Sequence, residues 1–126
     1  MRSQRQLRVG EEIRHALATV LMRGDLPWPV DFDPSTVTVT EVQVSPDLKN
    51  ATAFVMPLGG RRLKETVSAL NHHVGFFRHA LAQKVKLRHV PKLLFSPDRS
   101  FEYAQRISEL LNDPEVAKDL ERDEEE

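Results

Sequence analysis

The chain has 126 residues, eight of them aromatic, and no cysteine. This length suits one ordinary domain with its own core, and the lack of cysteine excludes disulfides and thiolate metal sites. The longest stretch without a formal charge, residues 66–77, is too short to span a membrane, and the first twelve residues contain no apolar signal core. We therefore expect a soluble, unexported, cytoplasmic protein.

The net charge of -1 conceals a basic middle and an acidic end. Residues 61–99 carry nine Lys or Arg against two acids, together with four of the five histidines, whereas residues 112–126 carry eight acids against two bases. A basic body of this kind favours a polyanionic partner. Solvated charge on an ordinary surface is an open alternative, because charge counts alone do not separate the two.

The first predicted element is an amphipathic helix from Gln4 to about Arg23. Its apolar residues recur mostly at steps of three and four, and Gly24 follows as a helix terminator. The next segment, LPWPVDFDP, contains three prolines and is predicted to be a stiff connector. Trp28 in this connector is expected to cap the core, because an aromatic side chain is first of all a large apolar surface.

Residues 37–56 are predicted to form a β-hairpin. Valines alternate with polar residues at 37 and 39 and again at 42 and 44, so the alternation changes phase at Thr40 and Glu41 and predicts a bulge there. The segment Ser-Pro-Asp-Leu at 45–48 has turn chemistry, and residues 50–56 are rich enough in β-formers to return as a second strand.

From Leu63 to Val85 the apolar positions follow one helical periodicity. Gly75 interrupts the pattern, since glycine costs about 1 kcal/mol relative to alanine inside a helix and permits a sharp change of axis. The residues alone leave a kink and a tolerated glycine as nearly balanced alternatives.

The remaining elements are a short strand, KLLF at 92–95, and a last helix that Ser100 caps. The apolar residues of this helix are Phe101, Ala104, Ile107, Leu110 and Leu111. The complete order predicts an α+β fold, a three-stranded sheet with helices covering one face. We expect a single domain over residues 1–112 and a mobile acidic tail over residues 113–126.

The sequence contains no recognisable catalytic or metal-binding motif. The glycines at 59 and 60 lack the Lys-Ser/Thr pair of a phosphate loop, and no serine lies in a nucleophile elbow. Side chains of His72 and His73 would point about 100° apart on a helix, and His79 and His89 have no carboxylate nearby in the sequence. We expect no enzymatic activity, no metal and no cofactor.

The basic residues are the more informative feature. On a helical wheel Arg78, Lys86 and His79 face away from the apolar arc, and Lys84 is expected to run its stem along the core edge with its ammonium group at the rim. The positive surface continues into the next loop with Arg88, His89 and Lys92. No Asp or Glu is present between Thr66 and Pro97, whereas a solvated helix face normally interleaves acids with its bases. This pattern favours an anionic partner.

RNA fits this charge distribution better than two alternatives. A single phosphorylated metabolite would need a focused pocket, and specific duplex DNA would need a recognition helix with Asn, Gln and Arg. Because the chain has few aromatic residues, we expect contacts to the RNA backbone to dominate over base stacking. A protein interaction module whose basic face binds an acidic protein is the rival hypothesis.

Three segments together resemble the bacterial ribosome-binding factor A family. They are RVGEEIRHALATVL in the first helix, VTVTEVQVSPDLKNATAFV in the hairpin, and ALNHHVGFFRHALAQKVKLRHVPKLLF across the helical pair and last strand. The resemblance covers about residues 4–112. It implies a type II KH domain with the order α-β-β-α-α-β and a mixed three-stranded sheet, which agrees with the order predicted above.

The resemblance also implies where RNA would bind. In the family the GxxG loop of ordinary KH domains is replaced by an Ala-x-Gly kink between two helices, and this sequence has His73-Val74-Gly75 at the matching place. We therefore expect binding by the kink, the basic helix and an N-terminal arm. The expected RNA-binding residues are Arg5, Arg8, His73, Gly75, Arg78, His79, Lys84, Lys86, Arg88, His89 and Lys92, with Arg2 as a further member of the arm.

In function, the resemblance implies a non-enzymatic assembly factor. Its expected partner is the small (30S) ribosomal subunit with 16S rRNA, whose maturation it would assist, notably in the cold. Ribosome-assembly GTPases are further candidate partners, and the protein is expected to be a monomer.

Overall fold

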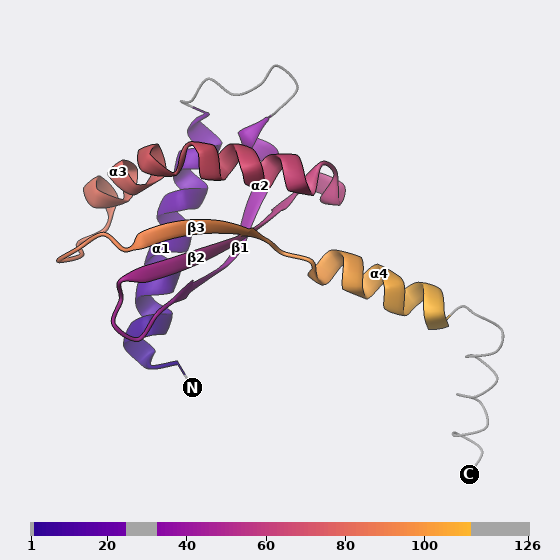
Figure 1. Ribbon diagram of the computed structural model, residues 1–126, viewed down its shortest axis with the longest axis horizontal. Coiled ribbons are helices and arrows are strands. Elements are labelled where there is room, and N and C mark those ends of the chain that lie inside the picture. The colour runs from indigo at the N-terminus through magenta and orange to yellow at the C-terminus, as the bar shows by residue number, and fades with distance from the viewer. Residues whose placement is uncertain (1, 25–32, 112–126) are drawn as a thin grey trace, which may run out of the picture.

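The computed structural model describes residues 2–24 and 33–111 (Figure 1). Trp28 and the acidic segment 113–126 lie outside the described residues. The helices are α1 (Gln4–Arg23), α2 (Leu63–His72), α3 (Val74–Lys84) and α4 (Ser100–Leu111), and the strands are β1 (Val37–Val44), β2 (Asn50–Pro57) and β3 (Lys92–Pro97). Two short 3-10 turns, Pro34–Thr36 and Leu58–Gly60, complete the order. No helix in the described parts of the chain has the length and apolar character needed to cross a membrane.

Helix α1 has the bounds expected from its periodicity. Ser3 and Gln6 form a capping box at its start, and Gly24 ends it in the left-handed conformation with φ 63°. The Gln6 side chain also donates a hydrogen bond to the carbonyl oxygen of Val44 at 2.9 Å, so the first turn of α1 is attached to the end of β1.

The middle of α1 lies directly on β1, at Gly10. A Cβ atom at this position would be 2.6 Å from the backbone oxygen of Val42. No real side chain tolerates that distance, and the obstructing atom belongs to a strand that cannot move independently. Only glycine therefore permits helix and strand to approach so closely.

The three strands form a mixed sheet with the order β1-β2-β3. β1 and β2 are antiparallel, and β2 and β3 are parallel. The register shifts between Val39, which pairs with Val55, and Glu41, which pairs with Phe54, so the predicted bulge at Thr40 and Glu41 is confirmed. The extra residue keeps the valines of β1 on the buried face along the whole strand.

The turn between β1 and β2 is held by a carboxylate. Asp47 accepts hydrogen bonds from the Ser45 hydroxyl at 2.6 Å and from the Lys49 amide at 3.0 Å. The Ser45 hydroxyl and then the Lys49 amide lower the pKa of Asp47 below its ordinary value, because both stabilise the charged form. The hairpin predicted for residues 37–56 is confirmed.

The long apolar pattern from residue 63 onward forms two helices, and the break falls at His73. This residue has φ -106° and ψ 22°, outside helical geometry, whereas Gly75 lies inside α3 without a positive φ. A Cβ atom at Gly75 would meet nothing within 4 Å. Of the two alternatives for Gly75, the tolerated glycine is therefore the correct one, and the kink lies two residues earlier.

A pair of hydrogen bonds explains the position of the break. The Asn71 side chain donates to the carbonyl oxygen of Phe95 at 2.9 Å and accepts from the Phe95 amide at 2.8 Å. The end of α2 is thereby attached to the exposed backbone edge of β3. The chain must change direction after this attachment so that α3 can place Phe77 and Leu81 in the core.

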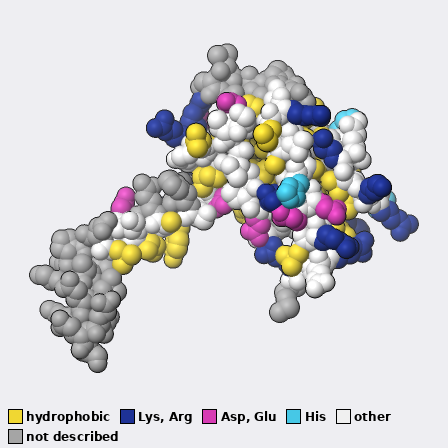
Figure 2. All heavy atoms as spheres, turned by 180° about the vertical axis from the view of Figure 1, so that it is seen from behind, with side chains coloured by type: hydrophobic (Ala, Val, Ile, Leu, Met, Phe, Trp, Pro, Cys, Tyr) yellow, Lys and Arg dark blue, Asp and Glu magenta, His cyan; other side chains and the backbone are white. Residues whose placement is uncertain are grey.

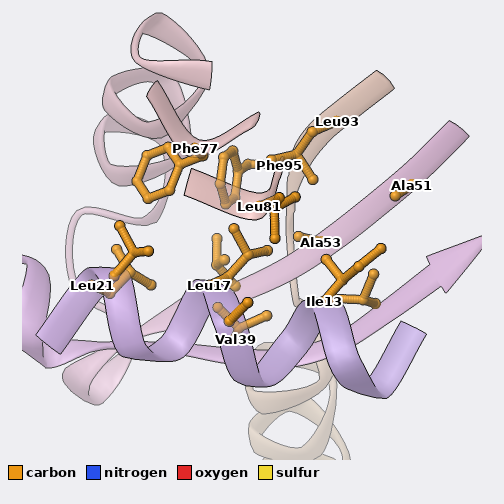
Figure 3. Close-up of a cluster of buried hydrophobic side chains, with 14 of the residues drawn as sticks. Ile13, Leu17, Leu21, Val39, Ala51, Ala53, Phe77, Leu81, Leu93 and Phe95 are labelled. Carbon is orange, nitrogen blue, oxygen red and sulfur yellow. The ribbon is translucent and has the colours of Figure 1, made fainter. Parts of the chain in front are cut away.

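Helices α1, α2 and α3 cover one face of the sheet and enclose a single core (Figure 3). Leu17 and Leu21 of α1 point toward Phe77 of α3 and Phe95 of β3, and all four are essentially inaccessible to solvent. The two phenyl rings meet edge to face, with centroids 5.0 Å apart. The prediction of a three-stranded sheet with helices on one face is confirmed.

Helix α4 departs from this arrangement. It extends away from the body beyond the end of β3, and Ala104, Ile107, Leu110 and Leu111 are exposed along it (Figure 1). The expectation that helices cover one face of the sheet therefore holds for α1, α2 and α3 but not for α4. The side chain of Phe101 lies outside the described residues. The other face of the sheet is left uncovered by the described helices.

Candidate nucleic-acid interface

The topology gathers basic residues at one end of the sheet. Because β3 runs parallel to β2, its first residue, Lys92, lies next to the start of β2, and its amide donates to the carbonyl oxygen of Lys49 at 2.8 Å. The hydrogen bond from Gln6 to Val44 places the first turns of α1 at the same end. We call the exposed cationic residues of this end the basic end. They are Arg5, Arg8, Lys49, Lys86, Arg88, His89 and Lys92.

The space-filling view supports this grouping. Figure 2 shows Lys and Arg side chains concentrated along the side of the molecule opposite to the projecting arm. Among the described residues, no carboxylate lies within ion-pair distance of the basic end, whereas Arg2 pairs with Glu41 at 2.9 Å. The basic end therefore has charge available for an external anion.

Lys49 was absent from the residues expected to bind RNA. It lies in the hairpin turn, far from the basic helix in sequence. The parallel pairing of β2 and β3 brings it beside Lys92. A topological argument from the order of the strands could have found it, whereas charge counting along the chain could not.

Arg78 has a different role from the one its place on the helical wheel suggests. Its Nε donates to the carbonyl oxygen of Pro91 at 3.2 Å, and its Nη2 donates to that of Val90 at 3.3 Å. These bonds attach the loop between α3 and β3 to the flank of α3. Arg78 therefore holds the loop that carries Arg88 and His89, and its guanidinium is not freely presented.

Lys84 and Lys86 lie beside α1, at a hollow of about 570 Å³ that Glu12 and His15 also line. The lack of acids between residues 66 and 97 therefore does not extend to the folded surface, because α1 brings a carboxylate to these lysines. Neighbouring Glu11 is engaged by Arg14, and the hydrogen bond from Arg14 lowers the pKa of Glu11. The positive charge of Lys84 and Lys86 is therefore partly offset on this side by Glu12.

His73, Gly75 and His79 lie away from the basic end, toward the kink. The His73 ring meets that of His72 edge to face at 5.1 Å, and a ring nitrogen of His79 lies 3.3 Å from Nε2 of Gln83. The structure thus divides the expected RNA-binding residues into two groups, one at the basic end and one at the kink and along α3. Among the described residues, no three His, Asp or Glu side chains form a group that could hold a metal ion.

The fold and the basic end define a class of protein, a small KH-like α+β domain with a cationic surface and no GxxG loop. The family model for ribosome-binding factor A matches residues 5–111, and the chain belongs to that family. A relative from Paramagnetospirillum magneticum, described as ribosome-binding factor A, is 51% identical over 118 residues, which cover 94% of this chain and 82% of the relative.

Solved structures agree with this assignment. A solution NMR structure of a Thermotoga maritima protein, described as a ribosome binding factor A, shares 30% identity and a TM-score of 0.64, covering 79% of this chain and 92% of that one. A homology model of the Thermus thermophilus factor, fitted into a cryo-EM map of its complex with 30S, shares 22% identity and a TM-score of 0.55 over 79% and 97% of the two chains. The second likeness bears on the fold alone. The expected α+β, KH-like fold and the family resemblance are confirmed.

Proposed function

We propose that this chain is a non-catalytic ribosome-assembly factor that binds the small (30S) subunit through 16S rRNA. Membership of the ribosome-binding factor A family supports this function, and so does the 30S complex named for the Thermus thermophilus protein. Its task would be to assist maturation of 16S rRNA in the cytoplasm, notably in the cold. The RNA-binding domain comprises residues 1–112 and precedes an acidic tail over 113–126, and the protein acts as a monomer.

The observation that carries the proposal is the unpaired charge of the basic end. Cations from three separate segments, the first helix, the hairpin turn and the loop before β3, meet there, and among the described residues none of them forms an ion pair with a carboxylate. Such a surface suits the sugar-phosphate backbone, because each neutralised phosphate releases a condensed counterion. Contacts to backbone and RNA shape, rather than to base edges, form the main part of the interface.

The proposed contact residues form two groups, one at the basic end and one along α3 and the kink. Arg5, Arg8, Lys49, Arg88, His89 and Lys92 touch the RNA at the basic end. Lys86 completes the basic end, and Lys84 and His79 extend the contact along α3. His73 at the kink and Gly75 in the first turn of α3 lie at the far end of this surface. Arg78 acts by holding the loop in place.

Filter binding to 16S rRNA at graded salt tests the electrostatic basis. If six or more phosphates are contacted, the affinity should fall by a factor on the order of 10³ between 50 and 200 mM salt. The triple variant Lys49→Ala, Arg88→Ala, Lys92→Ala should bind more weakly and show a shallower salt slope. A matched variant, Arg61→Ala, Lys64→Ala, Arg106→Ala, removes the same charge outside the basic end and should keep the slope of the wild type.

Two outcomes would contradict the proposal. An affinity that is flat across this salt range would remove the electrostatic mechanism, and equal losses in the two triple variants would show that net charge alone matters. The rival function, a module whose basic face binds an acidic protein, is separated by nuclease treatment of a cell extract. A partner that is retained after complete removal of RNA would support the rival. Assembly GTPases are candidates for such a partner.

A further inference from the structure

One side of α4 presents large apolar side chains to solvent. Tyr103 is 67% exposed, and Ile107, Leu110 and Leu111 continue the same side of the helix at steps of four and three. Figure 2 shows these hydrophobic side chains along one side of the projecting arm. A helix of 12 residues is only marginally stable in water on its own, so α4 needs a surface that covers this stripe.

The uncovered face of the sheet offers such a surface. On this face Leu94 of β3 is 55% exposed, and Phe54 and Met56 of β2 are half-buried. In the parallel register Leu94 pairs with Thr52, so Phe54, two residues further along β2, is its diagonal neighbour, and Met56 continues the same face of β2. They form an apolar track along β3 and β2.

The chain leaves β3 on this uncovered side. Asp98 follows the last strand residue, and its amide continues the ladder by donating to the carbonyl oxygen of Val55 at 2.9 Å. Its carboxylate accepts hydrogen bonds from the Ser100 amide at 2.8 Å and from the Ser100 hydroxyl at 2.6 Å. It also lies near the hydroxyl of Thr40, which donates to the carbonyl oxygen of Phe54 at 3.2 Å and contributes to the lowered pKa of Asp98. Thr40 belongs to the exposed side of β1, so the carboxylate that caps α4 already reaches over the uncovered face.

We propose that α4 folds back across the uncovered face of its own sheet, antiparallel to β3, with Asp98 and Arg99 as the connection. Two residues suffice for a strand-to-helix connection. Twelve helical residues span about 18 Å and six strand residues about 20 Å, so the helix matches the length of β3. Measured back from the connection, Ile107 lies about 10 Å along the helix and Leu94 about 10 Å along the strand. The docked helix therefore places Ile107 on Leu94.

The orientation is also consistent with the polar side of the helix. Glu109 lies about 160° around the helix from Ile107, so it faces water when Ile107 faces the sheet. No carboxylate is buried by the movement at this position. In the docked form the apolar side chains of α4 pack on the apolar track of β3 and β2. This packing gives α4 the apolar contact that its amphipathic sequence requires. This inference does not depend on RNA binding.

Disulfide trapping in the full chain tests the arrangement, because the protein has no cysteine of its own. The pair Leu94→Cys, Ile107→Cys should form an intramolecular disulfide in dilute, oxidised protein at least about ten times faster than the control pair Leu94→Cys, Glu109→Cys. Equal rates would overturn the proposal. Disulfide-linked dimers whose yield rises with protein concentration would assign the track to a second copy and would overturn it as well.

Hydrogen exchange distinguishes a docked helix from a rare encounter. Amides of α4 should exchange at least about tenfold more slowly in the wild type than in the Leu94→Asp variant, since the aspartate removes the apolar contact from an exposed position that the core does not need. The control Gln43→Asp places the same charge on β1, off the track, and should keep the protection. Unprotected α4 amides in the wild type would show that the helix is not docked and would contradict the inference.

Discussion

Gly10 and Gly75 are both helical glycines, but their surroundings are opposite. Gly10 faces the Val42 carbonyl oxygen, and Gly75 faces open space. We expect Gly10→Ala to lower the free energy of unfolding by about 2 kcal/mol or more, because the added methyl forces apart a helix and a strand that share the core. Urea denaturation monitored by circular dichroism measures this loss.

The matched substitution Gly75→Ala should raise the free energy of unfolding by up to about 1 kcal/mol, since alanine is the better helix former and meets no neighbour. A destabilised Gly75→Ala variant would show that the kink does need glycine at this position. In that case the break at His73 would depend on residue 75 as well.

Arg78 allows charge to be separated from geometry. Arg78→Lys keeps the positive charge but loses the two planar donors that bind the carbonyl oxygens of Val90 and Pro91. We expect the Lys92 amide to exchange faster and the RNA affinity to fall several-fold. Exchange measured by NMR and filter binding at one salt concentration check this. Lys86→Arg, which also conserves charge, should leave both quantities unchanged, and an Arg78→Lys variant that behaves in the same way would leave only an electrostatic role.

At the scale of elements, the two helices α2 and α3 depend on a tertiary contact. Asn71 makes both hydrogen bonds to the backbone of Phe95, and its replacement by alanine would leave two part-buried backbone groups without partners. We expect Asn71→Ala to lower the free energy of unfolding by about 1–3 kcal/mol. Denaturation curves with unchanged slope would support this, and a loss below about 0.5 kcal/mol would contradict it.

The start of α4 should respond to pH through Asp98. The Ser100 hydroxyl and then the Thr40 hydroxyl lower the pKa of Asp98, because both stabilise its charged form. Its contribution to stability is therefore fully present above the ordinary aspartate pKa and is lost as the pH falls through the lowered value of the folded state. In an NMR titration, Ser100→Ala should raise the pKa of Asp98 toward the ordinary range. An unchanged midpoint would show that this cap does not form in solution.

Local chemistry accounts for the elements that were predicted correctly. The left-handed cap at Gly24, the bulge at Thr40 and Glu41, and the Asp47 turn each follow from a few adjacent residues. The position of the helix break did not follow in the same way, because it depends on Asn71 and on a strand 24 residues away. Helical periodicity predicted α4 itself but not that its stripe would be exposed, since periodicity carries no information about the partner surface.

At the scale of the molecule, the candidate site was only partly predictable. Arg88, His89 and Lys92 follow one another closely in sequence and were found by charge alone, whereas Lys49 joins them only through the pairing of β2 with β3. Glu12 was missed as a neighbour of Lys84 and Lys86 for the same reason. The distribution of charge along the chain therefore indicated a polyanionic partner, but it did not indicate all the residues that form the basic end.

The acidic segment offers a test of the whole charge distribution. Residues 113–126 contain eight acids and two bases, a net charge of -6, so the chain of net charge -1 would become +5 without them. We expect deletion of this segment to raise the affinity for unrelated RNA at low salt. The deletion removes the repulsion between its carboxylates and the RNA phosphates, and it removes their screening of the basic end. An electrophoretic mobility assay against a non-ribosomal RNA measures the change. Equal affinities would remove any screening role of the segment.

The parallel pairing of β2 with β3 means that the cations of the basic end are neighbours only in the native state. In an unfolded chain, Arg5, Lys49 and Lys92 are separated by more than 40 residues from one another, and their charges are diluted along the coil. Recognition and folding are thus thermodynamically linked, so saturating RNA should protect the domain against heat. A variant that is destabilised without a change in any contact residue should therefore also bind RNA more weakly.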